Sequence, residues 1–231
     1  MYIIFTHGVT VGHIGGENMA VLCLYGQPGS GKTVNSTRLP GKTLLISSDN
    51  SALVLRNFDR PNLTIKTASN FKEFVDAFED ATNSKKFDNI IVDCLTDLID
   101  AYIVEIREGG FSGDIRQYYL AIYTKVKYLA RKAAFCDTNV VFNCWEEIET
   151  VTLPSGEIAN RVSPMLPAKI KQNVCGLCSV VAWVTSATKD GKKEWYYVTE
   201  GSPTCMAKDQ LYMRKNCLPE NAFTAPEGKK K

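Results

Sequence analysis

Short apolar runs alternate with longer amphipathic stretches along most of the chain. The apolar runs occupy residues 20–25, 42–47, 89–93 and 139–145. The stretches with helical spacing of apolar residues cover 71–82, 95–107 and 115–135, the first with Asn70 as a candidate N-cap. Because wholly apolar runs are typical of strands buried on both faces, this alternation predicts an α/β fold with a mostly parallel central sheet flanked by helices.

The pattern changes after residue 145. Residues 179–185 and 194–199 read as two strands, and the turn Lys189-Asp-Gly191 between them predicts a C-terminal antiparallel hairpin. The segment 149–174 is polar, and we expect it to be a flexible loop. A short helix is expected over about 32–38, and a short strand over 63–66.

The length of 231 residues suits one α/β domain. We place its core at 19–218, a flexible basic tail at 219–231, and an N-terminal extension at 1–18. The extension lacks the features of a signal peptide. Either the native start is Met19, or Tyr2-Ile-Ile-Phe5 adds an edge strand; both alternatives make it peripheral.

No apolar run approaches the roughly 20 residues that span a bilayer, so we expect no membrane association and a cytoplasmic location. The formal net charge of +2 favours neither the presence nor the absence of nucleic-acid binding. Cys23, Cys94 and Cys144 lie in apolar runs and are interpreted as core thiols. A structural zinc site at Cys175-Gly-Leu-Cys178 would need two more ligands, for which Cys205, Cys217 and two distant histidines are the candidates, so zinc is disfavoured and a redox role more so.

The strongest motif follows the first apolar run. Residues 26–33 match G-x-x-x-x-G-K-[ST] at every fixed position; they are Gly26, Gln27, Pro28, Gly29, Ser30, Gly31, Lys32 and Thr33. Glycines let the backbone N–H groups surround a phosphate at the start of a helix. Lys32 can reach the β- and γ-phosphates, and the Thr33 hydroxyl can bind Mg²⁺. The sequence therefore predicts binding of ATP with Mg²⁺.

Two acids follow later strands. Asp93 ends the buried run 89–93, where an acid can hold the water shell of Mg²⁺; the alternative is a simple helix cap. Asp49 ends the second strand and can orient the attacking water as a catalytic base. The run Ser-Ser-Asp-Asn-Ser around Asp49 is equally typical of a solvated turn, so both interpretations stay open.

Further polar residues follow the strand 139–145. Asn143, Trp145 and Glu146 close it, where a polar side chain can sense the γ-phosphate but a packed Trp is as expected. The segment 149–174 carries Arg161, Lys169 and Lys171, which could contact the phosphates of a nucleic acid. Ordinary solvated cations on an exposed hairpin are an equally good interpretation.

This order of motifs resembles the RecA-type phosphate-loop ATPase core. Leu-Tyr-Gly-Gln-Pro-Gly-Ser-Gly-Lys-Thr, followed closely by Leu-Pro-Gly-Lys-Thr-Leu-Leu-Ile, is similar to compact phage nucleotide-binding proteins, including the single-strand annealing proteins. The resemblance covers about residues 20–215. It implies ATP-dependent binding and annealing of single-stranded DNA in phage recombination, which would place the protein in the host cytoplasm.

The resemblance also implies roles for particular residues. Asp49 matches the position of the catalytic carboxylate, although RecA has Glu there, and the segment 150–174 matches the DNA-binding loop. Lys208 occupies the place of a lysine that reaches a neighbouring subunit's nucleotide, which implies a homo-oligomer with nucleotide between subunits. A single-strand-binding protein is a further expected partner.

Two other functions stay open. A nucleotide-dependent switch or loader that recruits a replication partner would use the same nucleotide site. A small-molecule phosphotransferase is less favoured, because the sequence has no arginine-rich cluster typical of a lid over the phosphates. Many functions share this core, so the fold alone does not choose among them.

Overall fold

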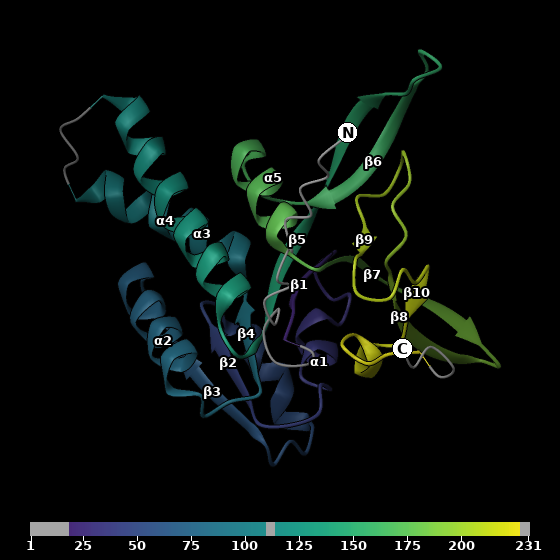
Figure 1. Ribbon diagram of the computed structural model, residues 1–231, viewed down its shortest axis with the longest axis horizontal. Coiled ribbons are helices and arrows are strands. Elements are labelled where there is room, and N and C mark those ends of the chain that lie inside the picture. Colours follow the sequence, from purple (N-terminus) through teal and green to yellow (C-terminus); the bar gives the residue numbers. More distant parts are fainter. Residues whose placement is uncertain (1–18, 110–113, 227–231) are drawn as a thin grey trace, which may run out of the picture.

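The computed structural model describes residues 19–109 and 114–226 (Figure 1). Its sheet has the strand order β10-β8-β7-β1-β5-β4-β2-β3, with β6 paired to β5 and β9 paired to β7. The strands are β1 (Val21–Gly26), β2 (Thr43–Ser47), β3 (Leu63–Thr67), β4 (Asn89–Asp93), β5 (Asn139–Thr152), β6 (Ile158–Pro164), β7 (Val180–Lys189), β8 (Lys192–Val198), β9 (Lys208–Asp209) and β10 (Asn216–Cys217).

Helices cover both faces of this sheet. They are α1 (Lys32–Ser36), α2 (Phe71–Ser84), α3 (Leu95–Glu108), α4 (Ile115–Phe135) and α5 (Ala168–Leu177), with short 3₁₀ helices η1 (Asn50–Asn57) and η2 (Pro219–Asn221). Six neighbouring strands, from β3 to β7, are parallel, and β8 and β10 continue the sheet in antiparallel fashion. The predicted α/β class, parallel sheet and C-terminal antiparallel strands are confirmed.

The apolar run of β1 is buried on both faces of the sheet. Val21, Cys23 and Tyr25 pack into the cluster under α2, α3, α4 and α5. Leu22 and Leu24 pack into a second cluster with residues that follow α1 and with the C-terminal segment. This alternation is the period of two that a strand imposes on its side chains. The predicted core thiols Cys23, Cys94 and Cys144 are all buried.

Several local predictions agree closely with the structure. The Asn70 side chain caps α2 by accepting a hydrogen bond from the Glu73 N–H at 2.8 Å. The strand β4 and the helix α4 have the predicted bounds. None of the helices in the described ranges is both long and apolar enough to cross a membrane.

The segment 149–174 forms the end of β5, the strand β6 and most of α5. The expected flexible loop is wrong, and the alternative of an exposed hairpin agrees with β5 and β6. Strands β5 and β6 pair in antiparallel register from Glu146 with Pro164 to Thr152 with Ile158, and this hairpin projects beyond the sheet (Figure 1). The signal in the sequence is the set of β-branched residues in 148–152 before Leu-Pro-Ser-Gly, which is strand and turn chemistry.

The C-terminal segment also departs from the prediction. Residues 219–226 were expected to begin a flexible tail, but Ala222 is buried in the second apolar cluster. Arg214 explains this order: its Nε donates to Asp209 at 2.5 Å, and its Nη atoms donate to the carbonyl groups of Asn221 and Ala222. The expectations for residues 1–18 and 227–231 lie outside the described residues.

Candidate active site

Parallel strands bring the candidate residues to one edge of the sheet. In the strand register Ser47 pairs with Asp93, and Asp93 pairs with Asn143. Gly26, where the phosphate loop begins, pairs with Trp145 on the next strand. The carboxyl ends of β1, β2, β4 and β5 therefore meet, which is where ligands bind in open parallel sheets.

The phosphate loop connects β1 to α1. Gly29 and Gly31 have φ angles of 76° and 80°, a region that other residues rarely adopt. A Cβ on Gly31 would also lie 3.2 Å from the Trp195 ring, closer than ordinary van der Waals contact, so the ring would have to move to admit it. The helix starts directly after Gly31, and its first N–H groups are left for a ligand.

Lys32 lies across this loop. Its Nζ donates to the carbonyl oxygens of Gly26 at 2.7 Å and Gln27 at 3.0 Å. Burial lowers the pKa of Lys32 from its ordinary value, and the negative charge of Asp93 partly offsets that effect. The ammonium group thus rests on two neutral acceptors, from which an incoming phosphate can displace it.

Asp93 is the centre of a buried polar cluster. Its carboxylate accepts hydrogen bonds from Thr33 Oγ1 at 2.7 Å, Ser51 Oγ at 2.9 Å and Asn143 Nδ2 at 3.0 Å. Burial raises the pKa of Asp93, opposed by these three hydrogen bonds, and the charge of Asp49 raises it further. The structure therefore brings Thr33 and Asp93, the two predicted metal-binding residues, into direct contact.

The cluster fits a nucleotide with Mg²⁺. A hydroxyl and a carboxylate are the oxygen ligands that Mg²⁺ prefers. Two buried atoms beside them, Asn143 Oδ1 and Ser30 Oγ, have no hydrogen-bond partner among the described residues, as expected where a ligand or its waters complete the site. Bound Mg²⁺ would be held by Thr33 and Asp93 and would supply charge neutralisation at the phosphates.

Asp49 lies beside this cluster and also has a structural role. It is the N-cap of η1, where its side chain accepts from the Ser51 N–H at 2.8 Å. The predicted turn is therefore the start of a 3₁₀ helix. Ser51, which no motif in the sequence marks, links the capped segment to the Asp93 carboxylate. The catalytic role of Asp49 stays a prediction.

A second carboxylate lies on the other side of the loop. Glu146 follows the core part of β5 and accepts from Trp183 Nε1 at 2.7 Å and from Gln27 Nε2 at 3.5 Å. Trp145 donates its backbone N–H to Thr96 Oγ1 at 3.0 Å. The side chain of Glu146 thus contacts the phosphate loop, whereas Trp145 pairs with Gly26 along the strand.

Comparison with known proteins assigns the family. The sequence profile of the AAA domain family matches residues 18–211. The chain belongs to the AAA domain family. This membership, together with the phosphate loop and its partner acid, supports a RecA-type phosphate-loop ATPase.

Other comparisons add little. No curated protein matches the chain in sequence. Among solved structures, the chain is similar to the flagellar accessory protein FlaH from Methanocaldococcus jannaschii, with 11% identity and a TM-score of 0.48. That likeness covers 87% of this chain and 84% of the other.

The predicted DNA-binding cations of this AAA domain have protein partners. Arg161 donates from Nε and Nη2 to Glu149 Oε1 at 2.9 and 2.8 Å. Lys171 is buried, where its Nζ contacts Glu147 and lies 3.3 Å from Glu149 Oε2 and 3.0 Å from Ser163 Oγ. Lys169 is exposed, with its Nζ 6.0 Å from the centre of the Tyr123 ring. Of the three, Lys169 alone has the exposure that a phosphate contact requires.

Lys208 lies away from the phosphate loop of its own chain. It pairs with Val181 near the start of β7, and its Nζ donates to the Gly176 carbonyl and to Gln210 Oε1, both at 3.2 Å. A role at a neighbouring subunit's nucleotide stays a prediction. Among the described residues, no group of three or more His, Cys, Asp or Glu is arranged to hold a metal ion. Cys175 and Cys178 therefore belong to no such group.

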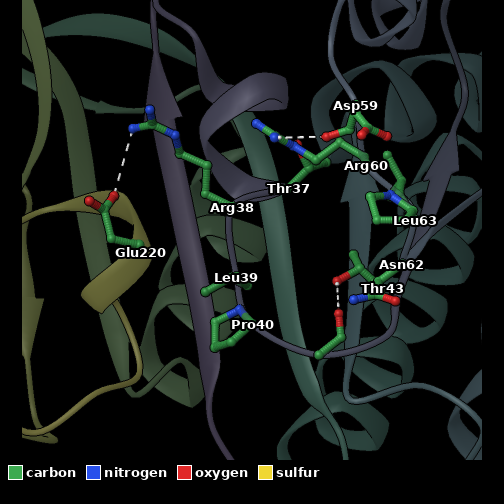
Figure 2. Close-up of a pocket in the computed structure, with 12 residues that line it drawn as sticks. Thr37, Arg38, Leu39, Pro40, Thr43, Asp59, Arg60, Asn62, Leu63 and Glu220 are labelled. Carbon is green, nitrogen blue, oxygen red and sulfur yellow. Dashed lines mark hydrogen bonds and ion pairs between the residues drawn. The ribbon is translucent and has the colours of Figure 1, made fainter.

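A pocket of about 490 Å³ lies at the opposite edge of the sheet (Figure 2). Thr43 and Leu63, which begin β2 and β3, line it, so it is at the amino ends of these strands. Its Arg38 forms an ion pair with Glu220 at 3.7 Å, and Arg60 donates to the Asp59 carbonyl at 3.2 Å. It contains no part of the phosphate loop, so the nucleotide site is not here.

Proposed function

We propose that this AAA domain is an ATP-hydrolysing phage recombination protein that binds single-stranded DNA and promotes its annealing. The resemblance of its motifs to compact phage annealing proteins motivates the choice of DNA. The family match supports the ATPase part. ATP with Mg²⁺ is the substrate complex, and a homo-oligomer with nucleotide between subunits is the expected assembly.

The observation that carries the proposal is the continuity of β5. One strand contains Asn143, which bonds to Asp93, then Glu146 beside the phosphate loop, and finally Glu147 and Glu149 in the projecting hairpin. Glu146 is itself paired with Pro164 at the base of the hairpin, so a change at Glu146 when nucleotide binds would pass directly into the hairpin. This arrangement supports coupling between ATP and a ligand bound near the hairpin and α5.

The chemistry at the site follows from the same contacts. The phosphate loop and Lys32 bind the phosphates, and Thr33 with Asp93 positions the metal ion. Asp49 or Glu146 orients the water that attacks the γ-phosphate. Lys208 of a neighbouring subunit would add positive charge at that phosphate.

A second candidate function is a nucleotide-dependent switch that recruits a protein partner. The hairpin favours it, because residues 145–164 contain four glutamates and one arginine, and that arginine is paired with Glu149. Ile148 and Ile158 are also 64% and 76% exposed on the hairpin. An acidic hairpin with exposed apolar residues suits a protein surface better than a phosphate backbone.

Steady-state ATP hydrolysis, measured alone, with single-stranded DNA and with duplex DNA, tests these alternatives. The recombination proposal expects stimulation by single strands and loss of that stimulation as salt is raised. Hydrolysis that responds to neither DNA, together with no DNA binding in a mobility-shift assay, would reject it in favour of the switch. Lys169→Ala should weaken DNA binding more than Arg161→Ala, because Arg161 is already paired.

A further inference from the structure

A cavity of about 350 Å³ lies beside the phosphate loop, between the loop and the hairpin of β7 and β8. Residues 27–30 form one wall, and Lys193 and Trp195 of β8 belong to the opposite wall. The Ser30 hydroxyl in this lining is buried without a hydrogen-bond partner among the described residues. The cavity therefore joins the phosphate-binding backbone to a strand that the phosphate-loop motif does not include.

Trp195 is fixed against the phosphate loop. Its ring is so close to Gly31 that a Cβ there would lie 3.2 Å from Cε2 and 3.4 Å from Cδ2. Trp195 also packs against the buried apolar cluster that contains Tyr197. These contacts give β8 a defined position relative to the loop.

Lys193 lies on the same face of β8, since it is two residues from Trp195. Its Nζ is 4.1 Å from the centre of the Trp195 ring. Among the described residues, no ion pair involves Lys193, in contrast to Lys72, Lys85 and Lys171. Its ammonium group thus rests on an aromatic ring beside the loop and has no carboxylate to neutralise it.

The lining of the cavity contains Lys193 and one carboxylate, that of Glu146. A hydrogen bond from Trp183 Nε1 at 2.7 Å positions this carboxylate without removing its charge. ATP carries more negative charge than Mg²⁺ and Lys32 together neutralise. A second ammonium group at the edge of the loop would lower that remaining charge.

We propose that Lys193 is a nucleotide-binding residue of the same chain as the phosphate loop, whose ammonium group leaves the Trp195 ring to contact the phosphates of bound ATP. The inference rests on the nucleotide-binding part of the proposed function and needs neither DNA nor a second subunit. It assigns the face of β8 that carries Lys193 and Trp195 to the nucleotide site.

The register of the hairpin supplies a matched control. Lys192 pairs with Lys189 and Lys193 pairs with Thr188, so the two neighbouring lysines point to opposite faces of β8. Lys192→Ala removes the same charge from the same strand without touching the cavity. Lys193→Arg keeps the positive charge but places a planar guanidinium where the ammonium group lies.

The test is the affinity for ATP, ADP and AMP, measured by titration calorimetry on the full chain with Mg²⁺. We expect Lys193→Ala to weaken ATP binding about tenfold and AMP binding much less, because AMP lacks the outer phosphates. Lys192→Ala should bind ATP within about twofold of the unchanged protein, because its exposed charge is screened by solvent. Lys193→Arg should retain more ATP affinity than Lys193→Ala, because it keeps the positive charge. Thermal melting of each variant without nucleotide verifies that the fold is intact.

Three results would overturn the inference. Equal ATP affinities for Lys193→Ala and Lys192→Ala would show that Lys193 makes no phosphate contact. An equal loss of ATP and AMP affinity would make the contact one to the nucleoside, and a lowered melting temperature in Lys193→Ala would make the role structural. Failure of the nucleotide site itself is a separate result, because the unchanged protein would then bind no ATP.

Discussion

Two buried lysines, one in the phosphate loop and one beside the hairpin of β5 and β6, differ in the groups that accept their hydrogen bonds. Lys32 is 8% exposed and Lys171 is 6% exposed. Lys32 donates to the backbone carbonyls of Gly26 and Gln27, whereas Lys171 contacts the carboxylates of Glu147 and Glu149. Neutral acceptors leave the charge of Lys32 available to an anion, and the two carboxylates already neutralise Lys171.

The pKa values reflect the same difference. Burial lowers the pKa of Lys32. Near Lys171, the group with a shifted pKa is Glu149. Burial acts to raise the pKa of Glu149, but hydrogen bonds from Arg161 and the charge of Lys171 outweigh burial, so this pKa is lowered. The charge of Lys32 in the phosphate loop therefore has no carboxylate partner, whereas Lys171 and Arg161 are paired with Glu147 and Glu149.

The largest effect is expected for Lys32→Ala. Since nothing else in the loop can supply this phosphate contact, we expect ATP turnover to fall at least about a thousandfold, with little change in melting temperature. Turnover is measured at saturating ATP with Mg²⁺, and Lys192→Ala is the control for charge removal. Unchanged turnover in Lys32→Ala would remove the assignment of the active site.

Asp93→Asn separates stability from activity in the same region. Asn keeps an acceptor for Thr33 but loses the charge that binds Mg²⁺. We therefore expect turnover to fall at least about a hundredfold. The folded state raises the pKa of Asp93 and so binds its proton more tightly than the unfolded chain. The stability of the Mg²⁺-free protein should therefore fall as pH rises through this raised pKa, and turnover should fall as pH drops through it.

The measurement for Asp93→Asn is melting temperature against pH without Mg²⁺, together with the pH profile of turnover. The variant should melt at a higher temperature than the unchanged protein at neutral pH, since it lacks the buried charge. A variant that melts lower at neutral pH would show that the ionised carboxylate stabilises the cluster, contrary to the direction of its pKa shift.

Asp49→Asn tests whether the capping residue is also the catalytic base. Asn is as good an N-cap as Asp, so the bond from the Ser51 N–H and the start of η1 are retained. We expect turnover about a hundredfold lower at unchanged ATP affinity and melting temperature. Turnover close to that of the unchanged protein would transfer the role to Glu146, for which Glu146→Gln is the matching variant.

Lys171→Met tests the other side of the comparison. Without the ammonium group, the neighbouring carboxylates of Glu147 and Glu149 repel each other and lose their shared partner. We therefore expect a loss of about 2 kcal/mol in the free energy of unfolding. The estimate is below that for fully buried pairs because both glutamates are about a third exposed. Urea denaturation measures it, and Lys169→Ala is the control on the same helix.

ATP affinity completes the test of Lys171. The folded Lys171→Met protein should bind ATP as the unchanged protein does, because no atom of Lys171 is part of the nucleotide cluster. A loss of ATP affinity without a loss of stability would contradict the distinction between the two buried lysines.

What the sequence predicts well is local. The phosphate loop, the Asn70 cap and the acid at the end of β4 each depend on a short run of residues and the strand that precedes it. The burial of Lys171 was not predicted, because its partners Glu147 and Glu149 lie more than 20 residues earlier and reach it only after the hairpin folds. The contact between Trp195 and Gly31 joins residues farther apart still.

Lys208→Ala is expected to have the smallest effect on turnover, and it extends the comparison of the lysines to Lys208. Its ammonium group donates to the Gly176 carbonyl and to Gln210, so, like Lys32, it has neutral acceptors within its own chain. If it completes a neighbour's site, Lys208→Ala should lower turnover about fivefold and leave the affinity of the isolated chain for ATP unchanged. Turnover per chain is measured against protein concentration, with Lys215→Ala as a control for an exposed ammonium group. Equal losses of turnover at all concentrations, or a parallel loss of ATP affinity, would place Lys208 in its own chain's structure, as its contact with the end of α5 also allows.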